Sequence, residues 1–108
     1  MEEVRTKGFT AKDMFNAATA ISLKNVIGET LKVVAVWICE RPDNNGEVQV
    51  VANLKTSDGT VYGTISDTVI RSALALPEML EESKSIAIKV ESRPGKEEGR
   101  EYLVITLA

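Results

Sequence analysis

The order of its β-rich and helical segments most limits what this chain of 108 residues can fold into. Three β-branched segments, Thr30 to Glu40, Glu47 to Thr56 and Thr60 to Ser66, are separated by the turn sequences RPDNNG and SDG. A helical pattern follows from Ser66 to Ser85, and SIAIKVES and EYLVITLA are the last two β-rich segments. The predicted order is therefore β-β-β-α-β-β.

Five strands with one helix between the third and the fourth are typical of the OB-fold, a small Greek-key barrel. The same order also permits an open α+β sheet. The small Ala35 in the middle of the first segment suits a strand that bends and serves both halves of a barrel. We therefore predict a mainly β chain with an OB-fold domain over residues 29–108.

Two helical regions carry sequence signals for where they begin or break. Thr10 and Asp13 are spaced as in a capping box, with Asp in place of Glu or Gln. Residues 1–28 are therefore expected to form either a short helix or an extended N-terminal arm. Pro77 interrupts the later helical pattern, so we expect a break or a restart there.

Composition excludes several classes of function. The chain has no histidine, so it cannot form a Ser-His or Cys-His nucleophile or a His-ligated metal site. A net charge of −3 excludes a diffuse polycation, and an anionic partner would need a local basic patch. We expect neither an enzyme nor a metal or cofactor site.

The expected location is cytoplasmic. One cysteine, Cys39, cannot form an internal disulfide, which fits a reducing compartment. The sequence has no run of 18 apolar residues and no apolar segment of a signal peptide at its start, so no membrane association is expected.

The segment SDGTVYGTIS contains a tyrosine among small residues. If Val61 and Gly63 face the core, Tyr62 faces outward, and the SDG turn makes the preceding strand its partner. We then expect Tyr62 to share the outer face with Gln49, Asn53 or Lys55. An exposed ring among hydrogen-bond donors is how proteins bind single-stranded nucleic acid, although Tyr62 could also be an ordinary surface residue of a strand.

Basic residues cluster in the loops that would flank this face. In OB-folds the ligand surface lies on strands 2 and 3, between the loops that follow strands 1 and 4. Tyr102 and Lys89 are expected to point outward from the last two strands. Trp37 is expected in the core with Leu31 and Val33, unless a bulge shifts it outward to a stacking position. The two loops here carry Arg41, Arg93, Lys96 and Arg100.

Residues of the segment D-G-x-x-Y-x-x-I-S-x-T-V, from Asp58 to Val69, resemble the small single-stranded DNA-binding proteins of phages with protein-primed replication. The resemblance runs from about Met14 to the C-terminus. It implies cooperative, sequence-independent coating of displaced strands during replication, with Tyr62 stacking on bases. It also implies the host cytoplasm as the location and a replication DNA polymerase as a possible partner.

A second class of function stays open at this point, an OB-like structural or protein-interaction module that binds no nucleic acid. A protein interface would favour a larger apolar patch on the outer face, where Gln49, Asn53 and Lys55 are polar. Glu97 and Glu98 could bind a metal, but Lys96 and Arg100 beside them favour solvated charge. The oligomeric state and the preference for DNA or RNA are not determined by these patterns.

Overall fold

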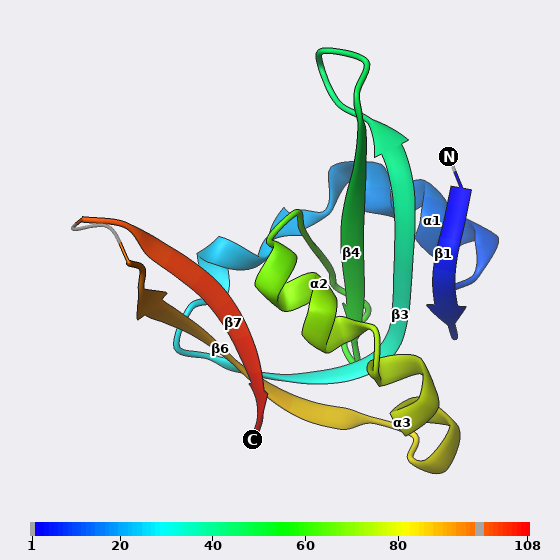
Figure 1. The fold of residues 1–108 in the computed structure, drawn as a ribbon. Coiled ribbons are helices and arrows are strands. Elements are labelled where there is room, and N and C mark those ends of the chain that lie inside the picture. Colours follow the sequence, from blue (N-terminus) through cyan, green and yellow to red (C-terminus); the bar gives the residue numbers. More distant parts are fainter. Residues whose placement is uncertain (1, 97–98) are drawn as a thin grey trace.

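A computed structural model describes residues 2–96 and 99–108, and its strands form one curled sheet with short helices on both sides (Figure 1). The chain is mainly β, as predicted. The elements in order are β1 (Glu2–Lys7), α1 (Ala11–Asn16), η1 (Ala17–Thr19), β2 (Ile21–Ser22), η2 (Leu23–Val26), β3 (Thr30–Pro42), β4 (Val48–Thr56), β5 (Val61–Thr64), α2 (Asp67–Ala73), α3 (Leu76–Glu82), β6 (Ile86–Pro94) and β7 (Glu101–Leu107).

The long strand β3 organises the sheet. The strand order is β2-β5-β4-β3-β6-β7, and β1 pairs in addition with β3. A register shift between Val33 and Ala35 divides β3: residues 30–33 pair with β6, while the later part pairs with β4 and β1. The predicted bend near Ala35 is therefore confirmed, and it lets one strand serve two diverging ribbons, β3–β4 and β6–β7 (Figure 1).

The expected closed barrel is only partly present. The five predicted strands occur in the predicted order, but no hydrogen-bonded ladder joins β5 to β7 within residues 2–96 and 99–108. The hydroxyl of Ser66 donates to the main-chain oxygen of Leu103, which brings the end of β5 near β7 without pairing the strands. The observed architecture is a curled open sheet.

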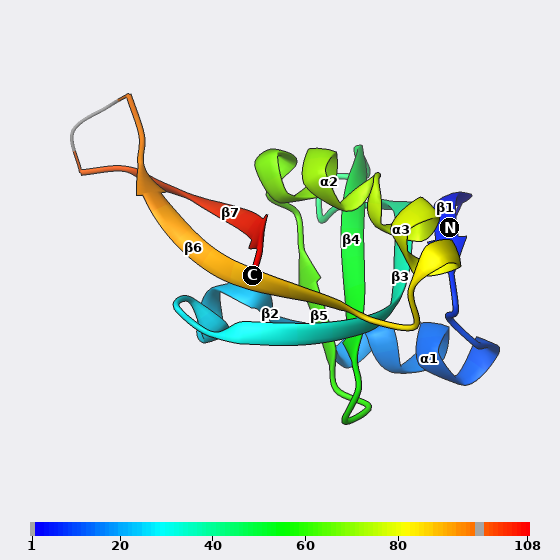
Figure 2. The ribbon, with the colours of Figure 1, turned by 90° about the horizontal axis from the view of Figure 1, so that it is seen from below.

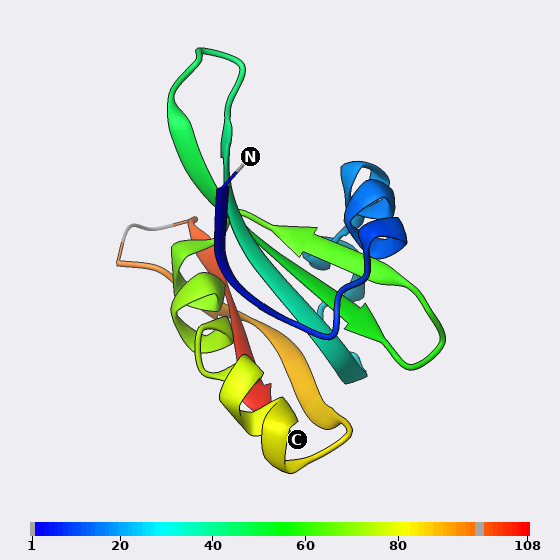
Figure 3. The same cartoon turned by 90° about the vertical axis from the view of Figure 1, so that its right-hand side faces the viewer.

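The predicted break at Pro77 is confirmed. The helical segment is divided into α2 and α3, and proline occupies the first turn of α3. Proline is favoured there because its missing N–H has no partner in a first turn. Both helices lie on the same side of the sheet, opposite α1 (Figures 2 and 3).

The N-terminal region forms a helix and not only an extended arm. The Thr10 hydroxyl accepts a hydrogen bond from the Asp13 amide, and the Asp13 carboxylate accepts one from the Thr10 amide, which confirms the capping box. The strand β1 was not predicted, because EEVRTK is charged and short and its pairing with β3 is decided by tertiary structure. Residues 1–28 thus contribute β1 and β2 to the same sheet as the rest of the chain.

The main core lies between the inner face of the sheet and the pair α2–α3. We define the inner face as the side of β3, β4 and β5 that carries Val36, Ile38, Ala52 and Leu54. These side chains pack with Val69 and other apolar residues of α2, α3, β6 and β7. Alternation along the strands leaves Ala35, Trp37, Val51 and Asn53 on the other side, the outer face.

Candidate functional site

The bulge in β3 decides which side chains reach the outer face. Trp37 pairs with Asn53 and Arg41 pairs with Gln49, so these residues share one side of β3 and β4. Trp37 is buried in the core, as predicted, but in a second cluster and not with Leu31 and Val33. The bulge moves it to the outer face, and its predicted stacking position there stays a prediction. The extra residue between Val33 and Ala35 reverses the alternation for the rest of the strand.

Tyr62 does not lie on this face, so its predicted orientation is wrong. It pairs with Leu54, and its half-buried side chain packs against the main core on the inner face. The β4–β5 turn explains the error, because the Thr56 amide donates to the Thr60 carbonyl and thereby pairs Lys55 with Val61. Even-numbered residues of β5 consequently share a face with even-numbered residues of β4.

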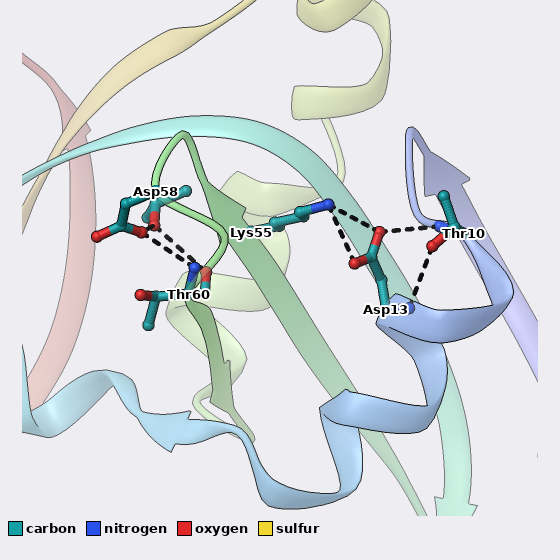
Figure 4. A network of polar contacts seen from close by, with 6 residues as sticks. Thr10, Asp13, Lys55, Asp58 and Thr60 are labelled. Atoms are coloured by element: carbon teal, nitrogen blue, oxygen red, sulfur yellow. Dashed lines mark hydrogen bonds and ion pairs between the residues drawn. The ribbon is translucent and has the colours of Figure 1, made fainter.

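The carboxylate of Asp58 fixes this turn (Figure 4). It accepts hydrogen bonds from the Thr56 hydroxyl and from the Thr60 amide, at 3.0 Å in the second case. These bonds lower the pKa of Asp58, with the Thr56 hydroxyl as the largest cause. The turn register that orients Tyr62 therefore depends on an ionised side chain.

Lys55 lies on the outer face as predicted but contacts the N-terminal helix. Its ammonium group lies 3.0 Å from the carboxylate of Asp13, which also closes the capping box of α1 (Figure 4). The Thr10 amide is the largest cause that lowers the pKa of Asp13, and Lys55 lowers it further. Lys55 therefore fastens α1 over the outer face, and its charge is already partly compensated.

A small second cluster lies under α1. Trp37, Cys39, Val51 and Val61 of the outer face pack with Ala17, and Phe9, Met14 and Ala20 cover them in part. The rings of Phe9 and Trp37 are tilted by 42° with centroids 6.1 Å apart, a favourable aromatic geometry. Burial raises the pKa of the Cys39 thiol, so this cysteine is not an activated nucleophile.

A groove remains open beside this cluster. We call it the outer groove; its volume is about 230 Å3, and Gly63 contributes to its wall where an added Cβ would lie 3.3 Å from Ala20. A second hollow of about 580 Å3 continues from it along the β3–β4 loop and is lined by Arg41, Gln49 and Ile65. The outer groove is lined by Ala17, Ala18, Ala20, Ser22, Arg41, Val51, Asn53, Gly63, Thr64 and Ile65.

A third, smaller hollow extends from the outer groove toward the indole. We call it the tryptophan pocket; its volume is about 70 Å3, and Ala17, Ala18, Arg41 and Asn53 line both spaces. Its remaining lining residues are Met14, Trp37 and Cys39. Arg41 borders all three hollows and forms no ion pair with the described part of the chain.

The remaining predicted residues lie on the other ribbon. Tyr102 pairs with Arg93 across β6 and β7, and Lys89 lies on the same side of this ribbon. Glu91 forms ion pairs with Lys89, at 3.9 Å, and with Arg93, at 3.3 Å. The structure therefore places Arg41, Gln49, Asn53 and Lys55 along one face of β3 and β4, and it places Lys89, Arg93 and Tyr102 on a ribbon that points away from them (Figure 1).

The loop between β6 and β7 carries two further predicted residues, Lys96 and Arg100, both exposed. The carbonyl of Arg100 accepts a hydrogen bond from the Gly95 amide at 2.7 Å, which closes this loop. The pair Glu97–Glu98 lies outside the described residues. Elsewhere, residues 2–96 and 99–108 hold no group of three His, Cys, Asp or Glu side chains arranged for a metal ion.

Several lining residues of the outer groove were not predicted from the sequence. Thr64 and Ile65 of the segment that leaves β5 border it, as do alanines of η1 and its flanks. The small side chains at Ala17, Ala18 and Ala20, opposite Gly63, are the one signal that could have indicated a close approach between two segments. No helix of the described chain is both long and apolar enough to cross a membrane.

Comparisons with known proteins add no relative. No protein-family model matches this chain, and no curated protein or solved structure matches it either.

Proposed function

We propose that the chain is a sequence-independent single-stranded DNA-binding protein that holds the strand along the outer groove. The observation that carries this proposal is the composition of the groove wall. Arg41 supplies a guanidinium that forms no ion pair with the described part of the chain, and Asn53, Thr64 and Ser22 supply neutral polar groups. No carboxylate is among the described residues that line the wall. In a chain of net charge −3, this is a local surface that accepts a polyanion.

The shape of the surface supports the same proposal. The outer groove continues along the β3–β4 hairpin through Arg41 and Gln49. An extended DNA strand therefore has a path along the protein that is longer than one nucleotide. Asp43 borders the second hollow, but its carboxylate already accepts hydrogen bonds from the amides of Asn45 and Glu47. Ligands of OB-type proteins bind on the corresponding strands and the loop that joins the first two of them.

The proposal also includes the fold type, the biological role and a protein partner. We assign the curled sheet to the OB type because its five main strands and its helical segment follow that order. Coating of displaced strands during phage replication, a replication polymerase as partner and action without catalytic turnover follow from the resemblance and from the absence of histidine. Tyr62 packs on the core, so base stacking by Tyr62 is not part of this proposal.

A binding titration tests the proposal. Fluorescence anisotropy of a labelled oligo-dT, recorded at several salt concentrations, should show saturable binding that weakens as salt is raised. Arg41→Gln should weaken binding and flatten the slope of log affinity against log salt by about 0.7, the contribution of one phosphate contact. Lys84→Gln, an exposed residue after α3, is the matched control and should leave the slope unchanged.

A protein-interaction module is the second candidate, and one observation favours it. Phe15 on α1 is 82% exposed, and Ile65 at the edge of the outer groove is also exposed. Apolar side chains of this size are typical anchors of protein interfaces. If oligo-dT does not bind at low salt, this second function should replace the first.

A further inference from the structure

The helix α1 carries an aromatic ring that contributes little to the core. Among the exposed large apolar residues of the described chain, Phe15 is the most exposed, at 82%. It lies on α1, which covers the outer face of the sheet (Figure 3). Single exposed apolar residues are common in soluble proteins, so the position of this ring matters more than its exposure.

The ring of Phe15 lies at the rim of the outer groove. Because α1 continues directly into η1, Phe15 and Ala18 are neighbours one turn apart, with about 5–6 Å between their Cβ atoms. Ala18 lines both the outer groove and the tryptophan pocket. Asp13 and Ala17 form the buried side of the same helical segment. A strand that follows the outer groove past Ala18 therefore meets the ring of Phe15.

The surroundings of this ring fit a single flat ligand. The residues one turn before and one turn after it are all exposed, and none is large and apolar: Ala11, Lys12, Ala18 and Thr19. A protein interface would need a larger apolar patch around the ring. A nucleobase is about as large as one aromatic side chain, so an isolated ring is sufficient to bind it.

The charge around the ring also suits a nucleic acid. Lys12 is exposed one turn before Phe15 and forms no ion pair with the described part of the chain. Asp13 is the only acidic residue between positions 8 and 28, and its carboxylate is paired with Lys55. A phosphate beside the ring would therefore meet an ammonium group and no free carboxylate of this segment.

We infer that Phe15 stacks on one base of the bound strand and that Lys12 contacts a phosphate beside that base. This inference rests on the proposed function, because the outer groove brings the strand to α1. Aromatic rings that stack on bases and cations that follow the backbone are the usual means of sequence-independent binding. The helix α1 is then part of the binding surface as well as the cover of Trp37.

Fluorescence anisotropy with oligo-dT at one salt concentration tests the role of the ring. Phe15→Ala should bind about tenfold more weakly than wild type, within the range for loss of one base–aromatic stack. Phe15→Tyr keeps an aromatic face and should bind as wild type does, whereas Phe15→Leu keeps only an apolar side chain and should lose most of the same affinity. All three variants should keep the wild-type unfolding midpoint, because the side chain is exposed. Tyr102→Ala, which removes an exposed ring from the β6–β7 ribbon, is the control and should bind as wild type does.

An abasic strand separates stacking from any other role of the ring. A strand of equal length with tetrahydrofuran in place of every nucleoside keeps the phosphates but has no bases. Wild-type protein and Phe15→Ala should bind this strand equally. Lys12→Gln should flatten the slope of log affinity against log salt by about 0.7 on both strands, the contribution of one phosphate contact.

The possible outcomes distinguish the inference from the proposed function. Wild-type affinity of Phe15→Ala or Phe15→Leu for oligo-dT would overturn the stacking, and so would an equal loss by Phe15→Ala on both strands. An unchanged salt slope in Lys12→Gln would overturn the phosphate contact. Each of these results would leave single-strand binding in the outer groove standing. Failure of the wild-type protein to bind oligo-dT at low salt would overturn the proposed function and this inference with it.

Discussion

The two faces of the β3–β5 sheet are built differently. On the inner face, eighteen buried apolar residues from both ribbons, η2, α2 and α3 form one cluster among the described residues. On the outer face the corresponding cluster has five members, and α1 is fastened over it by the ion pair of Asp13 with Lys55. The inner face buries most of its side chains, while the outer face leaves a groove, and its Arg41 guanidinium and Trp37 indole N–H have no ion pair or hydrogen bond with the described part of the chain.

This difference separates stability from binding. Burial of apolar area is the main source of folding free energy, so most of it comes from the inner face. In the proposed function, the polar groups of the outer face gain hydrogen bonds when a strand binds. A substitution on the inner face should therefore change stability more than binding, and one among the polar groups of the outer face should change binding more than stability.

The largest expected effect comes from truncating the inner face. Leu54→Ala should lower the free energy of unfolding by about 2–5 kcal/mol, because the side chain is fully buried in the main cluster. Urea denaturation followed by circular dichroism measures it. Val36→Ala on the inner face and Val51→Ala on the outer face form a chemically matched pair. Equal losses from these two valines would break the distinction between the faces.

Tyr62→Ala should destabilise the fold and not the complex. The ring is half-buried against the main cluster, so we expect a loss near the lower end of large-to-small substitutions, about 2 kcal/mol. Tyr62→Phe should change stability little, since the ring remains. Affinity for oligo-dT, measured well below the unfolding temperature, should stay at the wild-type value. A large loss of affinity with unchanged stability would show that Tyr62 belongs to the binding surface.

Thr10→Ala should loosen α1, the helix that lies over the outer face. Loss of this capping residue is expected to cost about 1 kcal/mol, and it should act on α1 in particular. Cys39 lies beneath that helix, so its rate of reaction with a disulfide reagent should rise about fivefold, the factor that corresponds to 1 kcal/mol. Ser66→Ala removes a hydrogen bond to β7 and serves as the control, with unchanged Cys39 reactivity. An unchanged rate in Thr10→Ala would show that α1 does not limit access.

Acid should weaken the contacts of Asp13 that hold α1 and the contacts of Asp58 that hold the β4–β5 turn. The pKa values of Asp13 and Asp58 lie below their ordinary value when folded. Their contribution to stability is therefore present above the unfolded pKa and is lost as pH falls through the folded pKa, that is, below about pH 4. Denaturation midpoints from pH 7 to pH 2.5 measure this loss. Asp13→Asn should make the decline shallower, and a decline of unchanged steepness would exclude Asp13 as its source.

The strands and the broken helix could be predicted because their signals are local. Alternation along β4, the turn at Asp58 and the capping box at Thr10 each specify a few neighbouring residues. The faces of β3 and β5 could not be derived in the same way. The bulge between Val33 and Ala35 and the pairing of Lys55 with Val61 each shift the alternation by one residue, and that shift moves every following side chain to the other face.

The candidate site shows the same limit. Arg41, Gln49, Asn53 and Lys55 share a face as predicted, since one strand pair and its alternation place them. The N-terminal helix that covers Lys55 and Trp37 depends on contacts across the chain, such as Asp13 with Lys55, which no sequence spacing indicates. The separation of Lys89, Arg93 and Tyr102 from this face likewise follows from the divergence of two ribbons.

The indole proton of Trp37 offers the most direct test, because the chain has a single tryptophan and its Nε1–H resonance is unambiguous. Nuclear magnetic resonance spectra of 15N-labelled protein, recorded during titration with oligo-dT, follow it together with the side-chain amide of Asn53. The account predicts that both resonances shift as the strand binds, while the backbone amides of Arg93 and Tyr102 on the β6–β7 ribbon stay in place. Shifts confined to that ribbon, with an unmoved indole resonance, would contradict binding on the outer face.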